Sequence, residues 1–278
     1  GNLGALAATA GITTVTFNDD GDGDNLVIDS GFNNTLRVNL DDGDNLLNAS
    51  AYTGTLTVAI TEAIADAAAD THTISGGTGL ADEILITADG TGIDTTDMAT
   101  LTGFEKITVA NNASTGTIVI NTATVADGST LTVDSSAITT STNTFTLDAS
   151  AETDGILVVN GSAGIDTITM TQSDQADTLS LGGAADIIKV ATGNLTSVDT
   201  INGGAGTDIL KMTDASTVID ADFTNITNLE SITQNTASHG MNLTLGSASS
   251  SAGLVTVTGG TGTNTVTVGS GYTGALTV

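Results

Sequence analysis

The chain has 278 residues, of which 32 are acidic and 4 are basic, so its formal net charge is −28. It contains no Cys, which excludes a disulfide scaffold, a zinc finger and a thiol nucleophile. Four basic residues are too few for a surface that binds nucleic acid or an anionic membrane. Hydrophobic residues reach 39%, which distinguishes the chain from a disordered acidic segment.

The small size of the side chains points to a thin β core. Aromatic residues make up only 3% of the chain, and Gly occupies 34 positions. Thr, Val and Ile, whose branched side chains suit a pleated surface, are common instead. A solenoid of stacked strands can be filled by small apolar residues, so this composition favours a solenoid. No run of 18 apolar residues is present, and no membrane insertion is expected.

Short apolar runs follow one another along the chain about every ten residues, separated by Gly, Asp, Asn and Ser. Many alternate with Thr, and this period of two predicts strands with one buried face. An Ala-rich stretch at 62–69 predicts one short helix. The runs lie at 26–28, 56–58, 84–86, 118–120, 156–159, 186–190, 255–258 and 266–268.

Internal repeats support stacked coils. The segment 25–32 recurs at 45–52 and again at 264–272, and a longer repeat relates 76–108 to 203–233. A unit of about twenty residues with two strands and two turns is one coil of a β-solenoid, and the chain length then predicts roughly fourteen coils. We therefore expect an all-β, right-handed parallel β-solenoid with little helix.

The repeats also suggest a division of the chain into three parts. The first, 1–58, would be the tail of a preceding repeat unit. Further coils would follow in 59–200 and in 201–278. Because both ends fall inside a repeat, we expect the chain to be a fragment of a longer array.

One glycine turn has the composition of a calcium site. Residues 203–210 match the nonapeptide G-G-x-G-x-D-x-U-x, in which U is a large apolar residue. The glycines let the backbone curl and aim carbonyl oxygens inward, and the Asp adds a carboxylate. Ligation by oxygen alone suits Ca²⁺. The predicted ligands in this turn are Gly203, Gly204, Gly206 and Asp208.

Degenerate relatives of this turn carry Asp82, Asp166 and Asp186, while a relative at 259–264 ends in Asn264 instead of Asp. Two acidic clusters occupy the same place relative to their strands, and their carboxylates would repel one another without a counterion. The cluster residues predicted as ligands are Asp19, Asp20, Asp22, Asp24, Asp42 and Asp44. The alternative for any single turn is an Asp that only forms the turn by bonding its own backbone.

These turns resemble the repeats of RTX, or haemolysin-type calcium-binding, proteins. The mixture of sparse nonapeptides with long Thr-, Ala- and Val-rich stretches is similar to RTX surface-layer proteins of the Caulobacter type, and so is 203–210 followed by 228–233. The chain departs from the pattern at Ala185, where a spacer residue is missing, and at Asn264.

The resemblance implies coils whose adjacent turns share Ca²⁺, type I secretion without a cleaved N-terminal signal, and an extracellular location at the cell surface. The partner would be further copies of the chain in a lattice, with cell-surface polysaccharide as a further candidate. The expected function is that of a structural component of a calcium-dependent surface layer. The alternative is an extender or ligand-binding region of an RTX adhesin.

Other residue patterns give little reason to expect an enzyme. His72 and His239 are the only imidazoles, and neither has neighbours that suggest a catalytic triad. Arg37 is the only Arg, whereas β-helix polysaccharide lyases need clustered Asp with a basic residue. Thr-x-Thr pairs such as Thr130/Thr132 would favour the adhesin if they formed a flat, ordered face; otherwise they are the solvent side of a strand.

Overall fold

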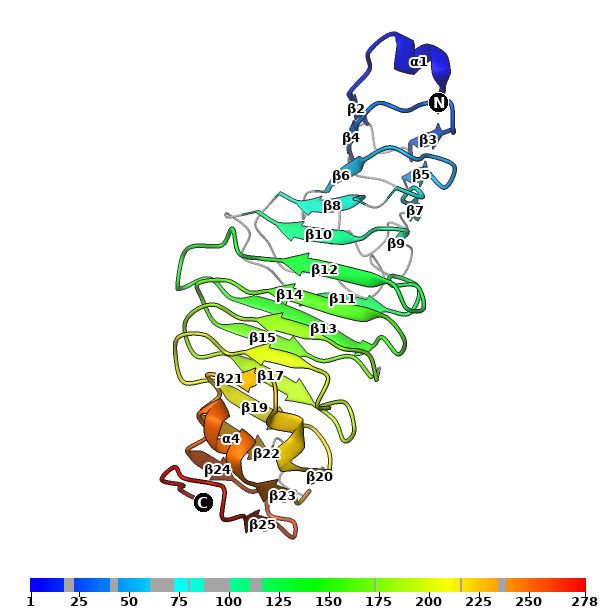
Figure 1. Ribbon diagram of the computed structural model, residues 1–278. Coiled ribbons are helices and arrows are strands. Elements are labelled where there is room, and N and C mark those ends of the chain that lie inside the picture. The colour runs from blue at the N-terminus through cyan, green and yellow to red at the C-terminus, as the bar shows by residue number, and fades with distance from the viewer. Residues whose placement is uncertain are drawn as a thin grey trace.

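The computed structural model describes residues 1–17, 23–40, 45–60, 73–79, 81–87, 101–110, 117–172, 174–215, 217–234 and 239–278. The strands stack along one elongated body, with the N-terminus at one end and the C-terminus near the other (Figure 1). Neighbouring strands of each sheet are parallel and come from successive coils. The predicted right-handed parallel β-solenoid is confirmed.

One sheet, here called the long sheet, runs through most of the molecule and contains ten strands. In hydrogen-bonded order they are β2 (Thr14–Thr16), β4 (Leu36–Asn39), β6 (Leu56–Ile60), β8 (Glu83–Ile86), β10 (Lys106–Val109), β12 (Thr130–Asp134), β14 (Ile156–Asn160), β16 (Thr178–Ser180), β18 (Thr200–Asn202) and β21 (Ile226–Thr227).

Strands of a second layer alternate with those of the long sheet along the chain. They form a five-stranded sheet in the first coils, a seven-stranded sheet in later coils, and a three-stranded sheet near the C-terminus. The five-stranded sheet holds β1 (Asn2–Leu3), β3 (Asn25–Ile28), β5 (Leu46–Asn48), β7 (Thr73–Ser75) and β9 (Leu101–Thr102). The seven-stranded sheet holds β11 (Thr117–Asn121), β13 (Phe145–Ala151), β15 (Asp166–Thr169), β17 (Ile187–Val190), β19 (Ile209–Met212), β22 (Ser231–Gln234) and β24 (Thr256–Thr258). The three-stranded sheet holds β20 (Thr217–Val218), β23 (Asn242–Leu245) and β25 (Thr265–Val268).

The number of coils is smaller than the sequence repeat predicted. Paired residues on adjacent coils are 20 positions apart between Arg37 and Thr57, but 26 apart between Lys106 and Thr132. The ten strands of the long sheet correspond to about ten coils, so the expectation of roughly fourteen is wrong. The reason is that many coils carry connections longer than two tight turns. The predicted division of the chain into three parts, with boundaries after residues 58 and 200, remains a prediction.

Three short helical segments are described: α1 (Ala5–Thr9), the 3-10 helix η1 (Asp220–Phe223) and α4 (Ser247–Ala252). The carboxylate of Asp220 accepts hydrogen bonds from the amides of Gly246 (2.7 Å) and Ser249 (2.9 Å) and so holds η1 against the start of α4. No helix in the described ranges has the length and apolar character needed to cross a membrane. The predicted helix at 62–69 lies outside the described residues.

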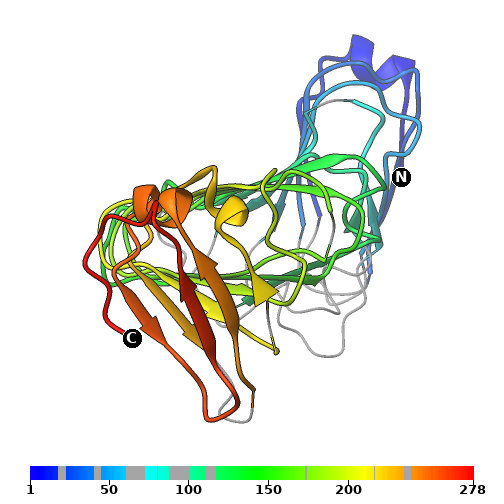
Figure 2. The same ribbon diagram turned by 60° about the horizontal axis from the view of Figure 1, so that its bottom comes forward.

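The core lies between the layers and is as thin as the composition predicted. In β12, Leu131 and Val133 are fully buried, whereas Thr130 is exposed. Leu157 and Val159 of β14 are paired with them one coil further on. Figure 2 brings the C-terminal end forward and shows the coils as flattened loops around this core. Each such aliphatic side chain contributes about 1.5–3 kcal/mol by its burial.

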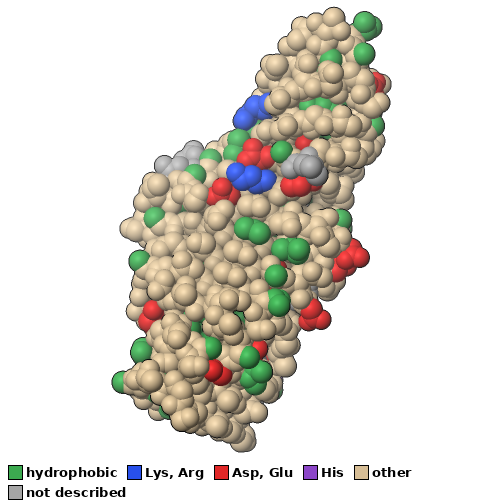
Figure 3. Space-filling model, in the orientation of Figure 1, with side chains coloured by type: hydrophobic (Ala, Val, Ile, Leu, Met, Phe, Trp, Pro, Cys, Tyr) green, Lys and Arg blue, Asp and Glu red, His purple; other side chains and the backbone are tan. Residues whose placement is uncertain are grey.

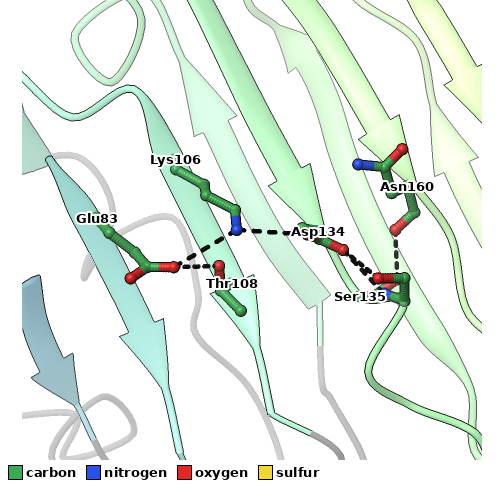
Figure 4. A network of polar contacts seen from close by, with 7 residues as sticks. Glu83, Lys106, Thr108, Asp134, Ser135 and Asn160 are labelled. Atoms are coloured by element: carbon green, nitrogen blue, oxygen red, sulfur yellow. Dashed lines mark hydrogen bonds and ion pairs between the residues drawn. The ribbon is translucent and has the colours of Figure 1, made fainter. Parts of the chain in front are cut away.

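The outer face of the long sheet carries one charged network. Lys106 lies between Glu83 on the preceding strand and Asp134 on the next, with its Nζ 3.6 Å from Glu83 Oε1 and 3.4 Å from Asp134 Oδ2 (Figure 4). Burial alone would raise the pKa of Asp134, but hydrogen bonds from Ser136 and the charge of Lys106 outweigh it and lower that pKa. Charged side chains are otherwise few on the face drawn in Figure 3.

Candidate functional site

Buried carboxylates stack from coil to coil at the start of the strands in the seven-stranded sheet. Asp166, Asp186 and Asp208 are fully buried, and Glu230 follows them on the next coil. The amide of Asp166 donates to Asp186 Oδ1 (2.8 Å), that of Asp186 to Asp208 Oδ1 (2.8 Å), and that of Asp208 to Glu230 Oε2 (2.8 Å). These four residues form one continuous carboxylate column.

The long sheet repeats this arrangement with the predicted Asp82 and with three acidic residues that the sequence did not single out. The amide of Asp177 donates to Asp199 Oδ1 (3.0 Å), and both side chains are almost fully buried. The amide of Asp82 donates in the same way to Glu105 Oε2 (2.9 Å). The signal that could have found Asp177, Asp199 and Glu105 is an acidic residue directly before a strand of period two.

The second oxygen separates these carboxylates into two kinds. Asp82 Oδ2 accepts from the amide of Gly77 (2.7 Å), and both oxygens of Asp166 accept from Ser162, at 2.7 Å and 2.8 Å. In contrast, Asp186 Oδ2 and Asp208 Oδ2 are buried and have no hydrogen-bond partner among the described residues. The two unpartnered oxygens therefore belong to adjacent coils of one column.

Glycine is required where the Asp208 turn closes. A Cβ atom on Gly203 would lie 2.5 Å from Asp208 Oδ2 and 2.1 Å from the carbonyl oxygen of Asn228. Gly204 and Gly206 have φ angles of +96° and +157°, in the region that L residues with side chains avoid. The predicted ligand residues thus converge in one turn that only glycine can form.

We expect Gly203→Ala to destabilise the chain by about 2–4 kcal/mol, because the added methyl group meets a backbone carbonyl that cannot move freely. Gly183→Ala is the matched control, since its Cβ would have no atom nearer than 3.6 Å. Urea unfolding followed by circular dichroism measures both. Equal midpoints for the two variants would contradict the expected clash.

Burial makes the column costly to ionise. It raises the pKa of Asp186 to about 7, with smaller contributions from the charges of Asp166 and Asp208. Burial also raises the pKa of Asp166, to about 6. The pKa of Asp208 is raised for the same reason. A proton or a cation at this column would relieve both the desolvation and the mutual repulsion.

The turn that ends in Asn264 is held by hydrogen bonds to both polar atoms of that side chain. Asn264 Oδ1 accepts from the amide of Met241 on the preceding coil (3.1 Å), as the column carboxylates do. Its Nδ2 donates to the carbonyl oxygens of Gly260 (2.7 Å) and Gly262 (3.1 Å). By sequence register, the corresponding glycines in the Asp208 turn are Gly204 and Gly206. The two turns differ in structure, because Gly204 and Gly206 have positive φ angles while Gly260 and Gly262 do not, and because Asn264 is exposed while Asp208 is fully buried. Where Asn264 presents a positive N–H group, Asp208 presents an unpartnered oxygen.

The remaining predicted ligands are placed as follows. Asp24 is half-buried, and its amide donates to Asn45 Oδ1 (3.1 Å). Asp19, Asp20, Asp22, Asp42 and Asp44 lie outside the described residues.

Nowhere in the described ranges do three or more His, Cys, Asp or Glu side chains form a group that could hold a metal ion. A calcium ion at the Asp186 and Asp208 turns would therefore need carbonyl oxygens and water beside the two carboxylates, which is ordinary for calcium. The orphaned oxygens of both residues fit such an ion.

No protein-family model, curated protein or solved structure matches this chain. What the chain does must therefore be argued from its own geometry.

The Thr face does not form an uninterrupted ladder on the long sheet. Thr132, Thr178 and Thr200 lie in one outward row, but Val158 stands between Thr132 and Thr178. Lys106 precedes Thr132 in the same row. The described strands thus present a mixed row rather than the ordered Thr array that would favour an adhesin.

Proposed function

We propose that this chain is a structural β-solenoid that requires calcium, part of a secreted bacterial surface layer that assembles from further copies of itself outside the cell. The observation that carries the proposal is the contrast between the Asp208 and Asn264 turns. Asn264 joins its turn carbonyls through an N–H donor, whereas Asp208 offers an oxygen with no donor.

The electrostatics of the Asp208 turn select a cation. A carboxylate oxygen and carbonyl oxygens repel one another when no water lies between them. A small divalent cation placed between them attracts both kinds of oxygen and so replaces repulsion by attraction. Asp186 on the adjacent coil presents a second unpartnered oxygen. An ion held by both turns would link two coils, as the resemblance to RTX repeats also implies.

A structural role accords with the shape and the charge. The parallel strands build a long rod whose coils are held by main-chain hydrogen bonds (Figure 1), and the face drawn in Figure 3 carries few charged side chains. The net charge of −28 opposes close packing of copies unless cations neutralise it. Calcium would serve both the fold and the assembly.

The binding test exploits the two related turns. In calorimetric titrations of the full chain with Ca²⁺, we expect Asp208→Asn to lose one ion, because the new amide group takes the place of the cation. Asn264→Asp should gain one. Asp148→Asn is the control, since Asp148 lies half-buried on β13 and bonds Ser150 locally. Unchanged binding in Asp208→Asn would refute the site.

The assembly test uses electron microscopy of the native cell surface with and without a chelator. We expect chelation to dissolve the layer, and Ca²⁺ but not Na⁺ at equal ionic strength to restore it. A layer that persists in the chelator would remove the support for a calcium-dependent lattice, even if the purified chain binds calcium.

A further inference from the structure

A second pair of unpartnered carboxylate oxygens lies in the turn that follows β13, away from the glycine turns. Glu152 is only 1% exposed. Its Oε1 accepts from three successive amides, those of Thr153 (2.9 Å), Asp154 (2.9 Å) and Gly155 (2.8 Å). Its Oε2 is buried without a partner, and so is Asp154 Oδ1. The Glu152 carboxylate is therefore anchored through Oε1, while its Oε2 has no hydrogen-bond donor.

The carboxyl groups of Glu152 and Asp154 act on each other electrostatically. Burial raises the pKa of Asp154, the charges of Glu152 and Asp127 raise it further, and a hydrogen bond with Glu152 favours its protonated form. Glu152 also adds to the raised pKa of the buried Asp177, for which burial is the main cause. The charges that act on this turn are thus all negative, although no three described carboxylates gather into one group.

The turn joins two adjacent coils. The amide of Gly128, beside Asp127 in the connection before β12, donates to the carbonyl oxygen of Asp154 (3.1 Å). The ion pairs found among the described residues both involve Lys106 on the outer face of the long sheet, so neither neutralises this turn. A buried carboxylate oxygen with no donor and no basic partner is stabilised by a bound cation or by a shared proton.

We infer that Glu152 and Asp154 form a further calcium site, which clamps the 126–129 connection to the coil that follows it. The available donors are all oxygens, as Ca²⁺ prefers. Three amides hold Glu152 Oε1 in place, so Oε2 is preorganised for a ligand. This site shares no residue with the Asp186 and Asp208 turns and does not match the nonapeptide.

The test compares Glu152→Gln and Asp154→Asn with the control Asp148→Asn. Gln keeps an oxygen for the three amides and places an NH₂ group where Oε2 was, so it can donate to Asp154. We expect Glu152→Gln to bind one Ca²⁺ fewer per chain by calorimetry. In chelator it should melt at a higher temperature than the wild type, and added Ca²⁺ should remove that advantage.

The outcomes separate this inference from the proposed function. Loss of one ion in Glu152→Gln or Asp154→Asn, but not in Asp148→Asn, supports the site. Wild-type stoichiometry in both variants overturns it and assigns a shared proton to the pair, whatever Asp208→Asn shows. If Glu152→Gln does not fold, Asp154→Asn decides alone, because Asp154 is partly exposed and its side chain anchors no amide.

Discussion

In 10 mM Ca²⁺ we expect the full chain to melt at least about 5 °C higher than in chelator. An ion that binds only the folded state adds about 2.7 kcal/mol when its concentration is 100 times the dissociation constant. Extracellular calcium modules have dissociation constants near 10⁻⁴–10⁻³ M, so 10 mM Ca²⁺ comes close to that regime. We expect Ca²⁺ to bind the folded chain more tightly than the unfolded chain, because only the folded chain holds the unpartnered oxygens of Asp186 and Asp208 on adjacent coils.

Differential scanning calorimetry measures the shift, with Na⁺ at matched ionic strength as the control for simple screening. In Asp208→Asn we expect the calcium-dependent part of the shift to shrink, while the melting temperature in chelator is maintained or raised. The reason is that an Asn side chain at this sequence position can donate to turn carbonyl oxygens, as Asn264 does to Gly260 and Gly262. An equal shift with Na⁺ would mean that charge screening, not a site, stabilises the fold.

In chelator we also expect the chain to be more stable at pH 5 than at pH 8, by at least about 5 °C in melting temperature. The pKa is raised from 3.8 to about 6 for Asp166 and Asp177 and to about 7 for Asp186, mainly by burial. Between pH 4 and pH 7 the folded state therefore binds more protons than the unfolded state. Stability is greatest below the unfolded pKa and falls as the pH rises through the folded values.

Thermal melts from pH 4 to pH 8 test this dependence, with and without Ca²⁺. Calcium should make the melting temperature depend less on pH. A bound cation stabilises the ionised carboxylates, so the folded chain no longer depends on their protonation at low pH. Asp186→Asn should also weaken the dependence in chelator, since burial raises the pKa of Asp186 to about 7. Stability that rises steadily from pH 5 to pH 8 in chelator would contradict the buried, proton-binding column.

Much of the fold follows from short stretches of the chain. The alternation in residues such as Leu131 and Val133 predicted strands with one buried face, and the structure places both side chains in the core. The glycines of the nonapeptide at 203–210 predicted a backbone that curls, and the positive φ angles of Gly204 and Gly206 agree. These features depend on neighbours within about ten residues, so they can be read locally.

The buried carboxylates at the start of the strands were only partly predictable. Asp82, Asp166, Asp186 and Asp208 stood out because each follows a small-residue turn. Asp177 lacks a glycine pair before it, yet its amide and carboxylate take the same part in the long sheet. The glycine motif therefore identifies some of these buried carboxylates. What they share is their place at or directly before the start of a strand of the coil.

The sequence by itself determined the strand period, the glycine turns, the excess of negative charge and the solenoid class. Only the tertiary structure decided the number of coils, the stacking of carboxylates and which of their oxygens are left without a donor. The physical reason is that contacts between coils join residues at least 20 positions apart, and the length of each connection sets their register. Asp166 and Asp186 follow similar turns, but Ser162 satisfies both oxygens of the first, and no described donor reaches Oδ2 of the second.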